Sequence, residues 1–420
     1  MSTSEPAASP RLQILRQALE REPSSALLAF WDEISEQGTP LVEPLLGDET
    51  HSLVTFLWRD DESSAVTVLC LLGGSQDRNM TRLRHSDLWF KTYRVRNDVR
   101  LTYQFVPEGP AQIGQEEEKT GNPWDSWRND PLDPLTFAFV EDPEEDPSDF
   151  PLIRSVLQMP EAPPQPWIQP RADAPSGQVS LQRVQSDVLG NERRVWVYTP
   201  PGYAPHSDVA YGLLILFDGW PAMKSLHTPT ILDNLLASGR LPPLVALFVD
   251  SLDGETRMRE LLYHKPLNDF LVKELVPWAR SAYRVTTDPR QTIVGGVSAG
   301  GLAAAFAALH HPGTFGCVLS QSGAFRHNPE GEEEPFWLAR QFAAREKLDL
   351  RFHLDAGLLE VHSLWDAGSG PSLLEANRHL RDVLSAKGYR VHYTEFAGGH
   401  DYISWRGTLA GGLQALLGSA

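Results

Sequence analysis

Residues 296–300 read Gly-Val-Ser-Ala-Gly, and this stretch decides how the rest of the chain is interpreted. The preceding residues 290–294 are typical of a short buried strand, and residues 302–309 are strong helix formers. A Gly-x-Ser-x-Gly segment between a strand and a helix predicts a nucleophile elbow, a turn whose flanking positions accept only very small side chains. The helix N-terminus behind the serine offers free N–H groups to a developing oxyanion. We therefore expect Ser298 to act as a nucleophile.

Composition excludes several other classes of protein. With 420 residues the chain has room for two domains, and its net charge of −18 disfavours binding to nucleic acid or to anionic membranes. Its two cysteines, Cys70 and Cys317, suggest neither a disulfide framework nor a metal cluster, so we expect no metal and no cofactor. No apolar run approaches the ~20 residues that span a bilayer, and no signal peptide is evident. The expected location is the cytoplasm.

The first part of the chain predicts an all-β domain with two leading helices. Residues 1–10 are expected to be disordered, and residues 11–36 carry two short helical patterns. Runs of β-branched and aromatic residues, separated by polar turn-rich stretches, then follow at 53–59, 65–71, 87–93 and 99–105. Short strands at this spacing indicate an antiparallel sandwich, which we expect to be immunoglobulin-like and to occupy residues 11–158.

A change in composition marks the second domain. Residues 159–177 are rich in proline, cannot continue a helix and are interpreted as a linker. Beyond them, over residues 178–420, strand-like segments alternate with helical ones; the strands are expected at 193–198, 212–217, 244–249, 292–294, 316–320, 349–354 and 390–395. The segment 213–217 is apolar throughout, as expected for a strand covered on both faces. This pattern predicts an α/β-hydrolase domain with a doubly wound, mostly parallel sheet.

A serine nucleophile needs a base and a carboxylate that orients the base. In α/β-hydrolases the carboxylate precedes the histidine along the chain. The last predicted strand leads into Phe-Ala-Gly-Gly followed by His400, a flexible approach that can bring the imidazole over the serine. Asp355 and Glu360 both follow the preceding strand and are both candidates for the acid.

The oxyanion hole is expected to use two backbone N–H groups. One belongs to Ala299, the residue after the nucleophile. The other comes from the loop after an earlier central strand, which here contains Gly219 and Trp220. Trp220 is also a candidate aromatic wall for a substrate.

Several long motifs resemble the enterochelin esterase family. In the first domain they are Phe-Trp at 30–31, Gly-Thr-Pro-Leu-Val-Glu-Pro at 38–44, Val-Thr-Phe-Leu-Trp-Arg at 54–59, Met-Thr-Arg at 80–82 and Asp-Leu-Trp at 87–89. The linker segment 155–165, Ser-Val-Leu-Gln-Met-Pro-Glu-Ala-Pro-Pro-Gln, is similar to that of the family, as are residues 315–323 and 398–406 of the second domain. The likeness covers nearly the whole chain.

The resemblance implies a cytoplasmic serine esterase that cleaves the trilactone of ferric tricatecholate siderophores, with iron present only as part of the substrate. It implies Ser298 as the nucleophile, His400 as the base and Glu360 as the acid. Residues 257–261, Arg-Met-Arg-Glu-Leu, match the family's arginine-rich motif near the site, and Trp405-Arg406 follow the histidine. The sequence departs from the family at the elbow, which reads Val-Ser-Ala instead of Gln-Ser-Phe, and after residue 323.

A ferric tricatecholate is a trianion, so an acidic chain must bind it through a local cationic pocket. The candidates are Arg257, Arg259, Arg326 and Arg406, because guanidinium groups pair with phenolate oxygens and stack on rings. The alternative function is a broad carboxylesterase that acts on aryl or carbohydrate esters.

Overall fold

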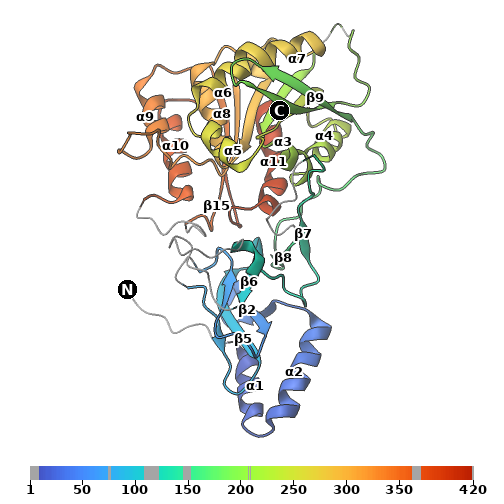
Figure 1. Ribbon diagram of the computed structural model, residues 1–420, viewed down its shortest axis with the longest axis vertical. Helices are drawn as coiled ribbons and strands as arrows, with labels where there is room; N and C mark the ends of the chain where they lie inside the picture. Colours follow the sequence, from blue (N-terminus) through green and yellow to red (C-terminus); the bar gives the residue numbers. More distant parts are fainter. Residues whose placement is uncertain are drawn as a thin grey trace. The chain divides into compact units, whose positions relative to one another are not determined.

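The computed structural model describes residues 9–73, 77–107, 123–144, 153–206, 208, 210–361 and 370–418 (Figure 1). The chain divides into two compact units. The N-terminal unit contains the chain up to Pro163 together with Ala397–Gly399, and the second unit contains Pro164–Val361 and most of the remaining residues.

One eight-stranded sheet forms the centre of the second unit. Its order is β16-β15-β14-β13-β11-β12-β10-β9. The strands are β9 (Gln178–Ser186), β10 (Asn191–Thr199), β11 (Gly212–Phe217), β12 (Leu244–Val249), β13 (Thr292–Val297), β14 (Cys317–Gln321), β15 (Arg351–Gly357) and β16 (Arg390–Phe396). The pairs from β12 to β16 are parallel, whereas β10 pairs antiparallel with β12 and β9. The prediction of a mostly parallel sheet is confirmed.

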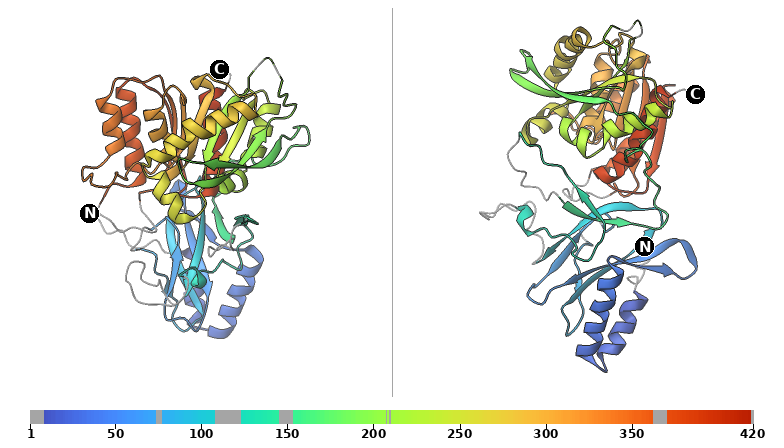
Figure 2. Two further views of the ribbon diagram at one scale, coloured as in Figure 1. Left: turned by 45° about the horizontal axis from the view of Figure 1, so that its top comes forward. Right: turned by 90° about the vertical axis from the view of Figure 1, so that its right-hand side faces the viewer.

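Helices cover both faces of this sheet (Figure 2). Along β11, Leu213 and Ile215 belong to one buried cluster and Leu214 and Leu216 to the other, since successive side chains of a strand point to opposite faces. The first face is covered by α5 (Gly254–Leu261), α6 (Lys265–Phe270), α7 (Val276–Ala282), α8 (Ala299–His310), α9 (Trp337–Ala344) and α10 (Leu373–Ala386). The second face is covered by α3 (Gly219–Lys224), α4 (Thr228–Ala237) and α11 (Tyr402–Leu417).

The N-terminal unit contains two four-stranded antiparallel sheets, ordered β1-β2-β5-β4 and β3-β6-β8-β7. The strands are β1 (Leu41–Leu45), β2 (Asp48–Arg59), β3 (Val66–Leu69), β4 (Thr81–Arg82), β5 (Leu88–Arg96), β6 (Arg100–Pro107), β7 (Thr136–Ala138) and β8 (Ile153–Gln158). Phe56 of β2 lies 4.7 Å from Tyr103 of β6, ring centre to ring centre, so the sheets pack face to face. The immunoglobulin-like topology stays a prediction.

This unit is not all β, because two helices complete its core. Helices α1 (Pro10–Leu19) and α2 (Pro23–Gln37) bury Leu15 and Trp31 against Leu57 of the first sheet. Ser9 caps α1 by accepting a hydrogen bond from the N–H of Leu12, and it is buried. The expected disorder therefore does not extend to residues 9 and 10, while residues 1–8 lie outside the described part of the chain.

The proline-rich segment 159–177 contains turns but neither a helix nor a strand, and from residue 164 it packs on the second unit. Ile168 is buried in the core on the α11 face of the sheet. The side-chain amide of Asn234 in α4 donates to the carbonyl groups of Trp167 and Gln169. Residues 167–169 are therefore fixed on the second unit and do not form a flexible linker. None of the helices in the described ranges has the length and hydropathy of a bilayer-spanning segment.

Candidate active site

Ser298 lies at a sharp turn between β13 and α8 and has a φ of 55° and a ψ of −117°. A Cβ at Gly296 would lie only 2.9 Å from the Cα of Gly300, so the glycine is required by the close approach of the two chain segments. A strained backbone held by its surroundings is typical of functional sites. The geometry matches the elbow that the sequence predicts.

His400 lies between Ser298 and Glu360. Its Nε2 is 2.9 Å from the Oγ of Ser298, and its Nδ1 is 3.0 Å from an Oε of Glu360. An ionised carboxylate can only accept, so Nδ1 carries the proton and Nε2 is left to accept from the serine hydroxyl. The side chain of His400 is 29% exposed, whereas the carboxylate of Glu360 is fully buried. Water can therefore reach the imidazole but not the carboxylate.

The structure distinguishes between the two candidate acids. The second oxygen of Glu360 accepts from the N–H of Gly357, which fixes the carboxylate at the end of β15. Asp355 lies within β15, where its side chain accepts from the N–H of Ser322 and lies 3.6 Å from the Nε2 of His353. Of these two acids, only Glu360 contacts the imidazole of His400 in the described part of the chain.

The loop after β11 lies against the elbow. Ala299 is the first residue of α8, so its N–H has no carbonyl partner within the helix. Gly219 begins α3 directly after Asp218, which has a left-handed backbone. A Cβ on Gly300 would lie 3.4 Å from Phe217 and 3.6 Å from the carboxylate of Asp218. The start of α8 at Ala299 and the loop that contains Gly219, which are expected to supply the two oxyanion donors, therefore lie together at one edge of the sheet.

Gly219 cannot carry a side chain at this position. A Cβ there would lie 2.7 Å from the indole of Trp196 and 2.9 Å from the carbonyl oxygen of Phe248. The neighbouring Trp220 lies 5.6 Å from Trp196, ring centre to ring centre, and Lys224 lies over its ring at 5.1 Å. The indole of Trp220 is half-buried by these contacts.

Arg257 is engaged within the protein. Its Nε and Nη2 donate to the two carboxylate oxygens of Asp218 at 2.6 and 2.7 Å, and Ser251 adds a hydrogen bond at 2.8 Å. The sequence predicts that Arg257 contacts the substrate, and this stays a prediction. In the structure its guanidinium makes a bidentate contact with Asp218, the residue before Gly219.

The other predicted arginines lie in different settings. Arg259 donates to the hydroxyl of Thr256 on its own helix, and Arg326 is half-buried in the loop after β14. Arg406 donates from Nε to the side-chain oxygen of Gln165 at 2.9 Å. Burial, and to a smaller extent the charge of Arg406, lower the pKa of His227.

The contacts around Trp405 and Arg406 involve residues that sequence reasoning missed. Trp405 is only 3% exposed, so it offers almost no surface to a substrate. Its indole N–H donates to the Oγ of Ser322, while Gln165 donates to the carbonyl of Ile403 in the same helix. Gln165 and Ser322 lie within the family-like segments 155–165 and 315–323, but the sequence does not predict these contacts, because the partners lie 241 and 83 residues away.

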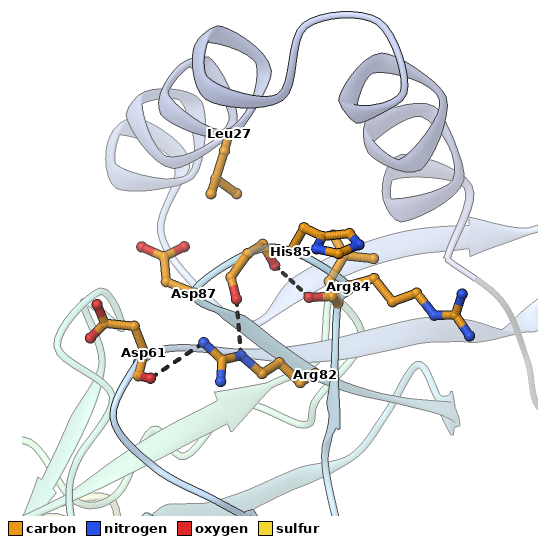
Figure 3. Close-up of a pocket in the computed structure, with 8 residues that line it drawn as sticks. Leu27, Asp61, Arg82, Arg84, His85 and Asp87 are labelled. Carbon is orange, nitrogen blue, oxygen red and sulfur yellow. Dashed lines mark hydrogen bonds between the residues drawn. The ribbon is translucent and has the colours of Figure 1, made fainter.

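A hollow lies in the N-terminal unit, between α2 and the turn after β4 (Figure 3). It has a volume of about 670 Å³ and is lined by Leu27, Asp61, Arg82, Leu83, Arg84, His85, Ser86 and Asp87. The hydroxyl of Ser86 donates to the carbonyl of Leu83, and the guanidinium of Arg82 donates to the carbonyl groups of Asp61 and Ser86 (Figure 3). The one hydroxyl in this lining is therefore not held by a base, in contrast to Ser298.

The elbow, the parallel sheet and the chain order serine, carboxylate, histidine define an α/β-hydrolase. Comparison with protein families agrees with this class. Residues 186–416 match the family of putative esterases, and residues 53–168 match the N-terminal domain of enterochelin esterases.

Individual relatives match over nearly the whole chain. The iron(III) enterobactin esterase of Dickeya dadantii is 31% identical, with 94% of each chain covered, and that of Escherichia coli K12 is 30% identical, with 88% and 92% covered. A crystal structure of the enterobactin esterase from Shigella flexneri with 2,3-dihydroxy-N-benzoyl-serine superposes with a TM-score of 0.70 at 29% identity, covering 92% and 97% of the two chains. The chain belongs to the enterochelin esterase family, and it is an esterase.

Proposed function

We propose that this protein hydrolyses the ester bonds that join the serine units of ferric tricatecholate siderophores such as enterobactin. The observation that carries this proposal is the contact chain from Ser298 through His400 to Glu360, at 2.9 and 3.0 Å. Relatives that match most of the chain are named iron(III) enterobactin esterases, which supports the substrate class. We also propose a cytoplasmic location and an immunoglobulin-like N-terminal domain over residues 11–158.

The proposed reaction is acyl transfer to the serine. His400 Nε2 takes the proton of Ser298 as Oγ attacks the ester carbonyl carbon. The N–H groups of Ala299 and of Gly219 or Trp220 stabilise the oxygen of the tetrahedral intermediate. The C–O bond to the leaving serine then breaks, and His400 returns the proton to that oxygen. Water, activated by the same imidazole, hydrolyses the acyl-enzyme.

Glu360 is the proposed orienting acid. Its buried carboxylate holds the proton of His400 on Nδ1 and stabilises the imidazolium that forms during attack. Asp355 is not given this role, because its side chain faces Ser322 and His353. The chemistry requires no metal or cofactor held by the protein, and the iron belongs to the substrate.

Cationic groups are needed for a trianionic substrate. Arg406 is the strongest candidate of the four predicted arginines, because Gln165 orients it at the start of α11, six residues after His400. Arg259 and Arg326 remain proposed contacts. Arg257 acts in this proposal through Asp218, as a brace for the oxyanion loop.

The test is mass spectrometry of the products formed from ferric enterobactin. Wild-type protein should release the linear trimer or smaller dihydroxybenzoylserine units, and the Ser298→Ala variant should release none. Parallel assays on p-nitrophenyl esters address the alternative substrate class. Turnover of simple aryl esters without hydrolysis of the siderophore would refute the proposed substrate and leave a broad carboxylesterase.

A further inference from the structure

Trp405 connects the histidine of the site to the strand next to the elbow strand. Its ring lies 4.8 Å from the ring of His400, centre to centre, at an interplanar angle of 88°. Its indole N–H donates to the Oγ of Ser322 at 2.8 Å. We propose that Trp405, anchored by Ser322, is a positioning residue that fixes the plane of the His400 imidazole. This inference rests on the proposed role of His400 as the base.

The imidazole needs a second constraint. His400 follows two glycines, so the chain before it contributes no side chain that could restrict its ring. The hydrogen bond to Glu360 fixes Nδ1 but permits rotation about that contact, which would move Nε2 away from Ser298. A perpendicular indole against the imidazole opposes this rotation, in the geometry that aromatic pairs favour.

Ser322 is a firm anchor for the indole. It follows β14, is fully buried and has a φ of 50°. Its N–H is 2.9 Å from the carbonyl oxygen of Asp355 and 3.2 Å from a carboxylate oxygen of the same residue. Gln321 also holds Trp405 in place, because its side-chain amide donates a hydrogen bond to the carbonyl of Trp405 at 2.8 Å.

The same segment also holds the nucleophile. The N–H of Ser298 donates to the carbonyl of Gln321, and the N–H of Ala324 donates to the carbonyl of Ser298, both at 2.9 Å. One short stretch of backbone therefore locates the elbow and, through the indole, the imidazole. This shared support fixes the separation of Oγ and Nε2, on which proton transfer depends.

The test is a double-mutant cycle with Ser322→Ala and Trp405→Phe. Each substitution removes the hydrogen bond between the indole and Oγ, and Phe retains an aromatic ring at position 405. We expect each single variant to lower kcat about tenfold on p-nitrophenyl esters and on ferric enterobactin, with KM unchanged, because only the geometry of proton transfer is altered. The double variant should be no slower than either single variant, because both remove the same interaction.

Ser320→Ala is the matched control. Ser320 is a buried serine two positions earlier, within β14, and within the described residues its Oγ has no hydrogen-bond partner. This variant should retain wild-type kcat. A substrate-free measurement completes the test: the downfield proton NMR signal of His400 Nδ1–H should broaden in Ser322→Ala and stay sharp in Ser320→Ala.

Wild-type kcat with a sharp Nδ1–H signal in Ser322→Ala, or additive losses in the cycle, would overturn the positioning role. A rise in KM alone would also overturn it and would indicate contact with the substrate. Absence of siderophore hydrolysis in the wild type is a separate result that bears on the proposed function, since the aryl ester and NMR measurements do not depend on the siderophore.

Discussion

Arg257 donates two hydrogen bonds to the carboxylate of Asp218, at 2.6 and 2.7 Å, directly before the predicted oxyanion residue Gly219. Asp218 has a left-handed φ of 58°, which an aspartate adopts at a cost. The bidentate contact stabilises this conformation and thereby the direction of the following N–H groups. Arg257, which lies in the segment that matches the family's arginine-rich motif, therefore stabilises the backbone of the loop that contains Gly219.

Arg257→Lys should lower kcat with little change in KM. Lysine keeps the charge but cannot make the bidentate contact, so the oxyanion loop loses its brace. Loss of one oxyanion donor costs about 10²–10³ in rate, which sets the upper limit of the effect. Steady-state kinetics on ferric enterobactin and on a neutral aryl ester provide the measurement.

Arg378→Lys is the control for this substitution. Arg378 makes the same bidentate contact with Glu395, at 2.7 Å for both bonds, between α10 and β16. Its loss should leave both kinetic constants near the wild-type values. If Arg257→Lys instead raised KM for the anionic substrate alone, Arg257 would be a substrate contact.

Glu360→Gln and Asp355→Asn separate the two candidate acids. The amide at 360 removes the charge that stabilises the imidazolium, so kcat should fall by about 10²–10⁴. Asp355→Asn should have a smaller effect on kcat, because Asp355 does not contact His400. Rates on an aryl ester decide between them, and the reverse order of effects would assign the acid to Asp355.

Gln165→Ala should weaken binding of the anionic substrate. Gln165 accepts from Nε of Arg406 and donates to the carbonyl of Ile403, so its loss removes one of the contacts that orient the guanidinium. We expect KM for ferric enterobactin to rise several-fold, while KM for a neutral aryl ester is unchanged. Gln182→Ala, on the solvent-exposed edge strand β9, should change neither value. If Gln165→Ala raised KM equally for both substrates, Gln165 would not act through the charge of Arg406.

Burial raises the pKa of Asp133 in the N-terminal unit to about 6, from the ordinary aspartate value of 3.8. Between roughly pH 4 and pH 6 the unfolded chain has released this proton while the folded chain retains it. The contribution of Asp133 to stability is therefore complete below pH 4 and is lost as the pH rises through 6. The two pKa values differ by about 2.2, and each pKa unit corresponds to about 1.4 kcal/mol, so the total loss is about 3 kcal/mol.

Asp133→Asn should remove this component of the pH dependence. The measurement is the free energy of unfolding of the N-terminal unit's transition within the full chain, at intervals from pH 4 to pH 6. Asp32→Asn, which changes an exposed carboxyl on α2, should keep the wild-type slope. An unchanged slope in Asp133→Asn would show that this carboxyl titrates normally.

The sequence by itself determined the parts of the protein that depend on local patterns. Alternating apolar segments predict the parallel sheet of the second unit, and the small residues at 296–300 predict the elbow, since only such residues permit the turn. The two glycines before His400 and its place after the last strand are likewise local features. Such features act over a few residues, so they can be read without knowledge of the fold.

Tertiary structure decided which distant groups meet. Asp355 and Glu360 are equivalent in sequence, and only the path of the chain after β15 brings Glu360 to His400. Arg257 faces Asp218, and Trp405 is buried against His400, because packing of α5 and α11 on the sheet sets their directions. A side chain's partner depends on its position in three dimensions, and one sequence alone does not encode that position in any local pattern.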